Sequence, residues 1–570
     1  MSEKTNSEGD GFSPNDRQQE IVENHEGIYL ADAGPGTGKT FTITCRYAEM
    51  LESGIDPDDI LLVTFTESAA EEMKRRVIDR SEYDIASLRD APINTFHGHC
   101  NRILDEDGFD APKYLGVDDS VTSSTRVIED EAVETSEFRS FYHRFVDRHP
   151  EYEDLYRAVR EPESLLDLVK SLAAKGAIPT SDGWFGDTEK YLHGDFDEFM
   201  SSFEEVNQQR GGSQSKLRKK LNDVFRDKLF TPTAPDEMEV RGEGKTVDRA
   251  VGEEAFNENR EHLKRFVHDL YYEYLEHALS RNYLNFSLLL VLTYVLLHEN
   301  HRVREETSYE YVVLDEFQDT SEIQLKLAML LSEKENICAV GDWKQSIFSF
   351  QYASVDNILE FEERLSRYKN ELNDGHKRVD YPVDDIERVP LEKNYRSTQQ
   401  ILDFSPQMLT LKGKKDEEVD ESILDRVTEL DADREVESQN TGIDAFVSED
   451  EVDAVLAEVE RVVGNPEYFI EEDDGTRELK YNDIAVLTRT RDFGVDLYER
   501  AREIGVPAGY EGGVELFGTE NEVSLRYDGD TYYCDTPTQL HKHDDEAAMR
   551  ACIEEMGYAD SDTTTTDGSA

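Results

Sequence analysis

The sequence predicts an α/β protein with a parallel sheet at its centre, and two observations carry this prediction. Short apolar runs alternate with longer amphipathic stretches, first over residues 28–104 and again over 309–350. A glycine-rich turn follows the first apolar run, and acidic residues follow two of the later ones. Alternating strands and helices are typical of parallel sheets with crossover helices, which bind ligands where their strands end.

Residues 28–51 are expected to form a strand, a tight turn and a helix. The turn has an alanine, four further residues and then Gly-Lys-Thr, which is the spacing of a phosphate-binding loop. A glycine-rich turn with a chance lysine is the alternative, and the strand before it and the helix after it argue against that. Lys39 would hold the β- and γ-phosphates and Thr40 a Mg²⁺ ion, so we expect ATP and Mg²⁺ as cofactors. The residues of this loop are Ala33, Gly34, Pro35, Gly36, Thr37, Gly38, Lys39 and Thr40.

The next strand-helix pairs are expected at 59–77 and 93–104. From about 106 to 280 the sequence turns polar and helix-rich, which predicts an insertion into the sheet domain. Within it, residues 210–228 carry seven basic residues against two acidic ones. This basic segment is a candidate contact for DNA or a protein partner, and a solvated helix face is the alternative.

The sheet pattern resumes at 309–331, where an apolar strand ends in Asp315 and Glu316, and at 335–350, where the next strand ends at Asp342. Carboxylates at the ends of parallel strands lie beside the phosphate loop in such folds. Asp315 is expected to bind Mg²⁺ and Glu316 to activate water. Gln345 follows closely and strengthens this interpretation.

The net charge of the chain is −65, from 127 acidic and 62 basic residues. Such a charge normally argues against nucleic-acid binding, which needs clustered lysine and arginine. Acid spread over every surface is also typical of proteins that work in concentrated salt, where the Debye length falls to about 3 Å and overall repulsion is screened. We favour this halophilic interpretation. The apolar runs are short, no basic-then-apolar leader begins the sequence, and the five cysteines are scattered, so a cytoplasmic location without a membrane partner is expected.

Taken in order, the motifs of residues 13–520 resemble those of the UvrD/Rep/PcrA family of superfamily 1 DNA helicases, with a third motif closer to the RecB/AddA branch. The resemblance implies two RecA-like domains and an ATP-dependent helicase or translocase of DNA repair or recombination, moving 3′ to 5′ on single-stranded DNA. The motifs that carry it read PNDRQQEIV, VTFTESAAEEM, NTFHGHC, LDEFQDTS, GDWKQSI and NYRS.

The resemblance also assigns roles to single residues. Gln18 would contact the adenine base and Arg46 would pack beside it. Asp315 and Glu316 would be the magnesium ligand and the general base, Gln345 would sense the γ-phosphate, and Arg396 would reach it from the second domain. DNA contacts are expected at Thr64, Phe65, Thr95, Phe96 and His97. Phe348 and Phe350 are expected to stack on bases, with burial in the core as the alternative for such aromatic residues.

The expected domains are 1–105 with 281–388 for the first RecA-like domain, 106–280 for the insertion, 389–520 for the second RecA-like domain, and 521–570 for a hairpin, a helix and a tail. Within the second domain a strand followed by a helix is expected at 441–463 and again at 482–507, and the hairpin is expected to turn at Asp528-Gly529. The second domain is expected to be incomplete, because the family's TxHxxKGLE and YVALTRA motifs are not found. Two alternatives therefore stay open: a truncated ATP- and DNA-binding subunit without motor activity, or half of a split helicase that needs a partner chain. In either case residues 1–570 alone would hydrolyse ATP slowly.

Overall fold

The computed structural model describes residues 13–81, 83, 88–156, 162–186, 188–193, 200–201, 249–345, 356–413, 429–433, 443, 447–472, 475–488, 490–510, 523–527 and 530–534. The chain divides into two compact units, Met1–Val436 and Glu437–Ala570.

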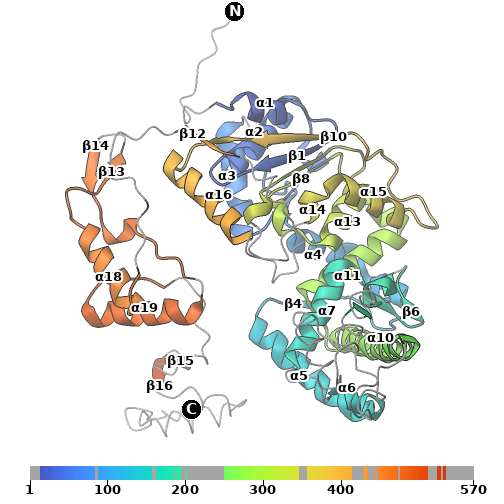
Figure 1. Cartoon of the computed structure of the whole chain (residues 1–570). Helices are drawn as coiled ribbons and strands as arrows, with labels where there is room; N and C mark the ends of the chain where they lie inside the picture. The colour runs from blue at the N-terminus through green and yellow to red at the C-terminus, as the bar shows by residue number, and fades with distance from the viewer. Residues whose placement is uncertain are drawn as a thin grey trace, which may run out of the picture. The chain divides into compact units, whose positions relative to one another are not determined.

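The first unit is built on a six-stranded parallel sheet with the strand order β10-β1-β9-β8-β2-β3, part of which is visible in Figure 1. This confirms the parallel α/β core. The strands are β1 Ile28–Ala33, β2 Ile60–Thr64, β3 Ile93–Thr95, β8 Tyr311–Leu314, β9 Ile337–Gly341 and β10 Ile386–Leu391.

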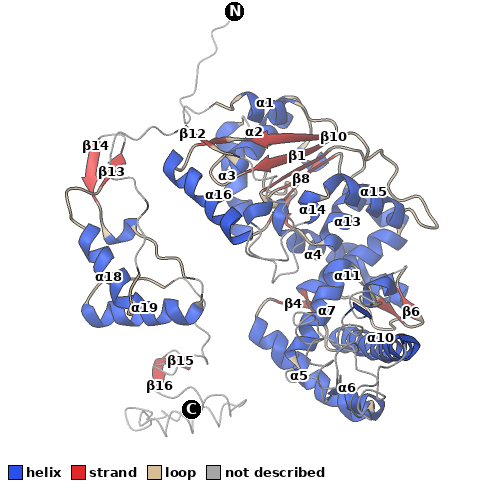
Figure 2. Cartoon of the chain, in the orientation of Figure 1, coloured by secondary structure: helices blue, strands red, loops and turns tan. Residues whose placement is uncertain are grey.

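Helices cover both faces of this sheet, so its four central strands are buried along almost their whole length and are mostly apolar (Figure 2). Tyr29 and Ala31 of β1 pack in one core with α1, α2 and α3, whereas Ile28 and Leu30 pack in the other with α4, α11, α13 and α15. The helices are α1 Asp16–Glu23, α2 Lys39–Glu52, α3 Glu67–Arg80, α4 Phe96–Asp107, α11 Phe286–Glu299, α13 Glu322–Leu331 and α15 Phe361–Leu372.

Between α4 and α11 the chain forms the helical insertion. Its core is aromatic, with Phe138, Phe141 and Phe145 of α5 packed against Phe266 and Tyr274 of α10. The short strands β4 and β7 pair in parallel where the insertion leaves and rejoins the core. The basic segment 210–228 lies outside the described residues. The elements are η2 Gly108–Leu115, β4 Arg126–Ile128, α5 Glu131–Arg148, η3 Pro150–Tyr152, α6 Glu153–Tyr156, α7 Glu163–Lys175, β5 Pro179–Thr180, β6 Gly183–Trp184, η4 Thr188–Leu192, α10 Arg249–Ser280 and β7 Tyr283–Asn285.

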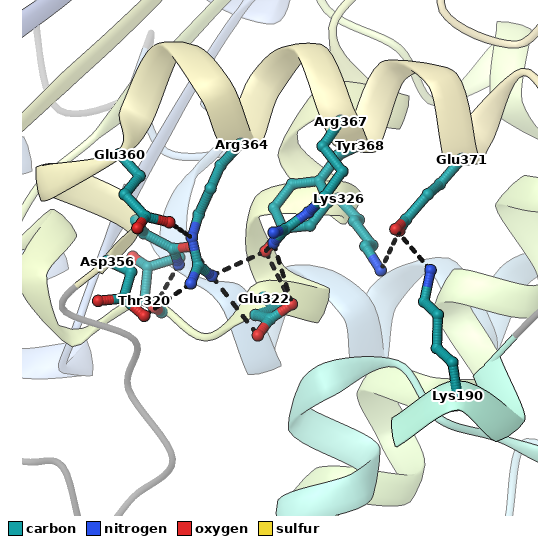
Figure 3. A network of polar contacts seen from close by, with 11 residues as sticks. Lys190, Thr320, Glu322, Lys326, Asp356, Glu360, Arg364, Arg367, Tyr368 and Glu371 are labelled. Carbon is teal, nitrogen blue, oxygen red and sulfur yellow. Dashed lines mark hydrogen bonds and ion pairs between the residues drawn. The ribbon is translucent and has the colours of Figure 1, made fainter. Parts of the chain in front are cut away.

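A network of charged side chains ties the insertion to the sheet domain (Figure 3). Glu371 of α15 accepts from Lys326 of α13 at 3.0 Å and from Lys190 of η4 at 2.9 Å. One helical turn earlier, the Tyr368 hydroxyl donates to Glu322 at 2.8 Å. Because Lys190 belongs to the insertion, this network fixes it against α13 and α15.

Strand β10 belongs to the first sheet, where it pairs with β1 as far as Leu391. It therefore crosses the boundary expected at 388/389, and the first unit continues to Val436. After β10 the chain forms β11, which pairs in parallel with β12. The remaining elements of this unit are η1 Pro57–Asp59, α12 His301–Glu306, η6 Phe317–Asp319, η7 Trp343–Gln345, α14 Asp356–Leu359, β11 Lys393–Asn394, α16 Gln399–Gly413 and β12 Asp431–Ala432.

The second unit holds two helices around a small core of Leu456, Ala501 and Val506. Both helices were expected, but the strand expected before α19 is absent from the described residues 484–488. Within residues 484–488, Leu487 is almost fully exposed, so this apolar side chain does not pack in a core. The hairpin expected around 528–529 is confirmed by β15 and β16. The elements are α18 Glu451–Val462, β13 Phe469–Glu472, β14 Gly475–Glu478, η9 Tyr481–Asp483, α19 Arg491–Ile504, β15 Val523–Tyr527 and β16 Asp530–Cys534.

The described residues contain no helix that is both long and apolar enough to cross a membrane. Helix α11 is apolar on all sides because it is buried on all sides, between the sheet domain and the insertion.

Candidate nucleotide site

The phosphate loop joins β1 to α2 through two left-handed glycines. Gly36 has φ +71° and Gly38, the N-cap of α2, has φ +83°, a conformation that side chains other than glycine rarely adopt. The Thr37 hydroxyl donates to the Gly34 carbonyl at 2.8 Å and closes the loop on itself. Lys39 then begins α2, so the free N–H groups of the helix start face the same region as the loop. This is the arrangement with which proteins bind phosphate.

Lys39 is buried, and its Nζ lies 3.1 Å from Oε2 of Glu316. Glu316 follows the end of β8 and has φ +47° and ψ +46°. A non-glycine residue in this left-handed region is strained by about 1–2 kcal/mol, and such strain concentrates at functional sites. The strained backbone places the Glu316 carboxylate against the phosphate-loop lysine, as the sequence motifs predicted.

Asp315 is only 8% exposed, and its Oδ1 has no hydrogen-bond partner among the described residues. Burial, together with the neighbouring charge of Glu316, raises the pKa of Asp315 to about 7. A buried carboxylate oxygen without a donor is a suitable ligand for a hard divalent cation. The Asp315 carboxylate and the Thr40 hydroxyl border the same cleft of about 330 Å³, so these residues fit Mg²⁺.

The cleft also contains a relay of side chains that the sequence did not reveal. Gln318 donates to Glu316 at 2.6 Å and accepts from the backbone N–H of Asp342 at 2.9 Å. The buried Asp342 carboxylate accepts from Gln345 at 2.9 Å. Gln345 is thereby connected to Glu316 through two intervening residues. Asp319 adds another carboxylate to the cleft, and burial with the charge of Glu316 raises its pKa to about 6.

Gln18 connects α1 to the phosphate loop, and Arg46 connects the end of α1 to α2. Gln18 donates to the Thr37 carbonyl at 3.0 Å and accepts from the backbone of Asn15 at 3.0 Å. The guanidinium of Arg46 is buried and donates to the carbonyls that end α1, at Ile21, Asn24 and His25. Their contacts with adenine remain predictions.

Arg396 lies on a turn that contacts the phosphate loop. The backbone N–H of Tyr395 donates to the Gly36 carbonyl at 2.9 Å. Arg396 itself is exposed, so its guanidinium is accessible to a bound group.

The residues expected to contact DNA occupy different surroundings. Thr64 and Phe65 border the nucleotide cleft. Thr95 caps α4 by accepting from Gly98 at 3.0 Å, and Phe96 is buried in the core. The His97 ring lies 4.6 Å from that of Phe286, and burial lowers its pKa to about 4, so it is neutral. Phe348 and Phe350 lie outside the described residues. All these DNA contacts remain predictions.

A parallel α/β core with a phosphate loop, an adjoining pair of strand-end carboxylates and an arginine turn defines a P-loop nucleotide-binding protein. Residues 14–366 match the family model for the UvrD/REP helicase N-terminal domain. Residues 389–524 match the model for the UvrD-like helicase C-terminal domain. This chain belongs to the UvrD/REP helicase family. Residues 513–561 match a family of unknown function.

Three relatives illustrate the similarity. The ATP-dependent DNA helicase PcrA of Leuconostoc citreum is 25% identical over 512 residues, covering 88% of this chain and 50% of the relative. A probable DNA helicase II homolog of Mycoplasma capricolum is 26% identical over 395 residues, covering 69% of this chain and 40% of the relative. PcrA of Staphylococcus epidermidis is 26% identical over 400 residues, with the same two shares. The chain spans half or less of the length of these relatives.

Proposed function

We propose that this chain is an ATP-driven DNA helicase or translocase that acts on single-stranded DNA. The observation that carries the proposal is the meeting of Lys39, Asp315 and Glu316 at one cleft, with the turn that bears Arg396 against the phosphate loop. The family to which the chain belongs supports it, as do relatives named as ATP-dependent DNA helicases. Movement from 3′ to 5′ and a role in DNA repair or recombination follow from the family resemblance and are parts of the proposal, as is the cytoplasmic location expected from the sequence.

The residues of the cleft divide the work of ATP hydrolysis among them. The loop N–H groups and Lys39 hold the phosphates, and Thr40 and Asp315 would hold Mg²⁺, which neutralises charge on the phosphate oxygens. Glu316 accepts a proton from the attacking water, and its carboxylate is oriented by Gln318. Arg396 supplies positive charge to the transferred phosphoryl group from the far side.

The geometry of the cleft also suggests how hydrolysis reaches the DNA. Thr64, the last residue of β2, and Phe65, in the loop between β2 and α3, are two of the expected DNA contacts and border the nucleotide cleft. A change in the cleft on hydrolysis would therefore displace this loop directly. In the proposed motor, the ATP site and this part of the DNA-binding surface are therefore adjacent.

The test is DNA-stimulated ATPase activity of residues 1–570 in molar KCl, with and without an unstructured single-stranded oligonucleotide. We expect stimulation by the oligonucleotide. Lys39→Ala should abolish nucleotide binding, whereas Glu316→Gln should bind nucleotide and not turn it over. Lys113→Ala, on the surface of η2, is the control and should behave like the parent.

Folded protein that neither binds nor hydrolyses ATP would refute the proposal. Binding of ATP and DNA without turnover in the parent would favour the subunit without motor activity over the helicase.

A further inference from the structure

The turn that carries Arg396 is fastened to the phosphate loop by one buried side chain, that of Asn394. Strand β10 runs beside β1 in parallel register, with Leu391 opposite Ala33, so the loops that follow the two strands leave the sheet together. Asn394 lies in the second of these loops and is fully buried. Its Nδ2 donates to the Pro35 carbonyl of the phosphate loop.

The other end of the same side chain shapes the arginine turn. The Asn394 Oδ1 accepts from the backbone N–H of Arg396 at 2.9 Å and from that of Ser397 at 2.7 Å. An asparagine that accepts from the N–H groups two and three residues ahead fixes the backbone of the turn that follows it. Asn394 therefore determines where the Arg396 backbone lies and, through Nδ2, fixes this position relative to the phosphate loop.

The two loops approach each other most closely at Gly36. A Cβ atom added to Gly36 would lie 2.7 Å from Cβ of Arg396 and 2.8 Å from Nδ2 of Asn394. The backbone N–H of Tyr395 donates to the Gly36 carbonyl, and the Tyr395 hydroxyl accepts from Asn15, the N-cap of α1, at 2.8 Å. The turn that carries Arg396 thus packs directly against Gly36 and its backbone. The Asn394 side chain forms hydrogen bonds both to this turn and to the phosphate loop.

We propose that Asn394 is a positioning residue for ATP hydrolysis, which holds Arg396 at the distance from the phosphate loop that the transition state requires. This inference rests on the proposed function. Asn394 makes no contact with substrate in this role and acts through Arg396. Since a displacement of about 1 Å in a reacting site can lower a rate about 100-fold, losing this fixed distance should affect turnover far more than nucleotide binding.

The experiment measures single-turnover ATP hydrolysis and nucleotide affinity for the full chain and its variants. Asn394→Ala removes both ends of the connection. Asn394→Asp keeps the size and the acceptor for the turn but loses the donor to Pro35, so it tests the connection in a protein whose turn is intact. Both should lower the hydrolysis rate about 10- to 100-fold and change nucleotide affinity by less than about 3-fold.

Asn373 provides a matched control. Its Oδ1 accepts from the backbone N–H groups of Arg378 and Val379, and its Nδ2 donates to the Val379 carbonyl, so it makes the same number of bonds to the backbone, within one loop that does not border the cleft. Asn373 is half-buried, and Asn373→Asp should reduce thermal stability and leave the hydrolysis rate unchanged.

A double-mutant cycle separates positioning from general stability. In an Arg396→Ala background, Asn394→Asp should alter the rate by less than about 2-fold, because the residue it positions is gone. Full additivity of the two changes, or an unchanged rate in Asn394→Asp alone, would overturn the inference. If the parent chain hydrolyses ATP, these results bear on Asn394 alone; a parent without turnover would overturn the proposed function and this inference with it.

Discussion

Replacing Glu371 with glutamine should destabilise the first unit by about 3 kcal/mol, although this residue is far from fully buried. The reason is its neighbour Lys326, which is 2% exposed and lies 3.0 Å from the Glu371 carboxylate (Figure 3). Burial lowers the pKa of Lys326, and the charge of Glu371 opposes this shift. Without that carboxylate, Lys326 would keep the more distant charge of Glu322 and its contact with the ring of Tyr368, 4.8 Å away, as compensation for a buried charge.

The magnitude follows from the two arms of the network. Removing one partner of a buried ion pair costs about 3–5 kcal/mol, and we take the lower end because Glu371 is 25% exposed. The arm to Lys190, which is 41% exposed, should contribute only about 0.2–1 kcal/mol. Lys326→Met removes the buried charge while filling the space, so it should be nearly neutral, and in combination with Glu371→Gln it should restore most of the lost stability.

The assay is urea unfolding at a fixed, high KCl concentration, followed by tryptophan fluorescence. The chain has two tryptophans. Trp184 belongs to the insertion and Trp343 to the sheet domain, so the signal reports the two sides that the network joins. Burial raises the pKa of Glu371, but Lys326 and Lys190 together outweigh burial and hold it below its usual value. Its contribution should therefore be complete above about pH 4.5, the pKa of an unfolded glutamate, and disappear as the pH falls through the folded value.

Equal losses for Glu371→Gln and Lys190→Met would refute the reasoning, because the buried lysine would then carry no special penalty. So would a double variant, Glu371→Gln with Lys326→Met, that is no more stable than Glu371→Gln alone.

Three further predictions concern the site and its surroundings. His99 is buried, and burial with the charge of Arg102 lowers its pKa to about 3, below the 6.5 of an unfolded histidine. The free energy of unfolding should therefore fall as the pH drops from 6.5 toward 3. His99→Gln should reduce the slope of the unfolding free energy against pH by up to about 1.4 kcal/mol per pH unit. Gly36→Ala should abolish nucleotide binding measured by fluorescence titration, whereas Gly54→Ala, at φ +89° with nothing within 4 Å, should cost about 1 kcal/mol of stability and leave binding intact. Asp315→Asn should remove nucleotide-dependent Mn²⁺ binding, measured by electron paramagnetic resonance, and retained Mn²⁺ binding would show that Asp315 is not a metal ligand. The same variant should raise the melting temperature at pH 8, because the raised pKa of Asp315 means that its negative charge opposes folding at that pH.

Local sequence signals predicted the core strands and the strand ends at which the candidate catalytic residues lie. The phosphate loop and the Asp315-Glu316 pair each lie within one strand-turn segment, so periodicity and spacing were sufficient to find them. The isolated run at 484–488 was predicted as a strand for the same reason, and this was wrong, because an apolar run forms a strand only where another strand pairs with it. Local patterns thus indicate where a strand can form, but pairing with another strand determines whether it does.

Contacts between distant segments could not be predicted. The position of β10 beside β1 depends on pairing across more than 300 residues, and a single sequence contains no signal for register at that range. The same holds for the bond from Asn394 to Pro35 and for the relay from Gln345 to Glu316. Each of these links connects motifs that the sequence identified separately.

The structure also explains how a chain of charge −65 can have a site for a polyanion. The lining of the nucleotide cleft is itself acidic, with Glu72, Asp315, Glu316 and Asp319 opposed by Arg76, while Glu316 is paired with Lys39. A nucleotide bound in the proposed way must separate Lys39 from Glu316, because its phosphates become the counter-ions of the lysine. The carboxylate released by this exchange is the one proposed to accept the proton from water. In the proposed mechanism, therefore, the general base is held in an ion pair until the substrate arrives, and a divalent cation that enters with the phosphates offsets part of the negative charge that they bring into an acidic cleft.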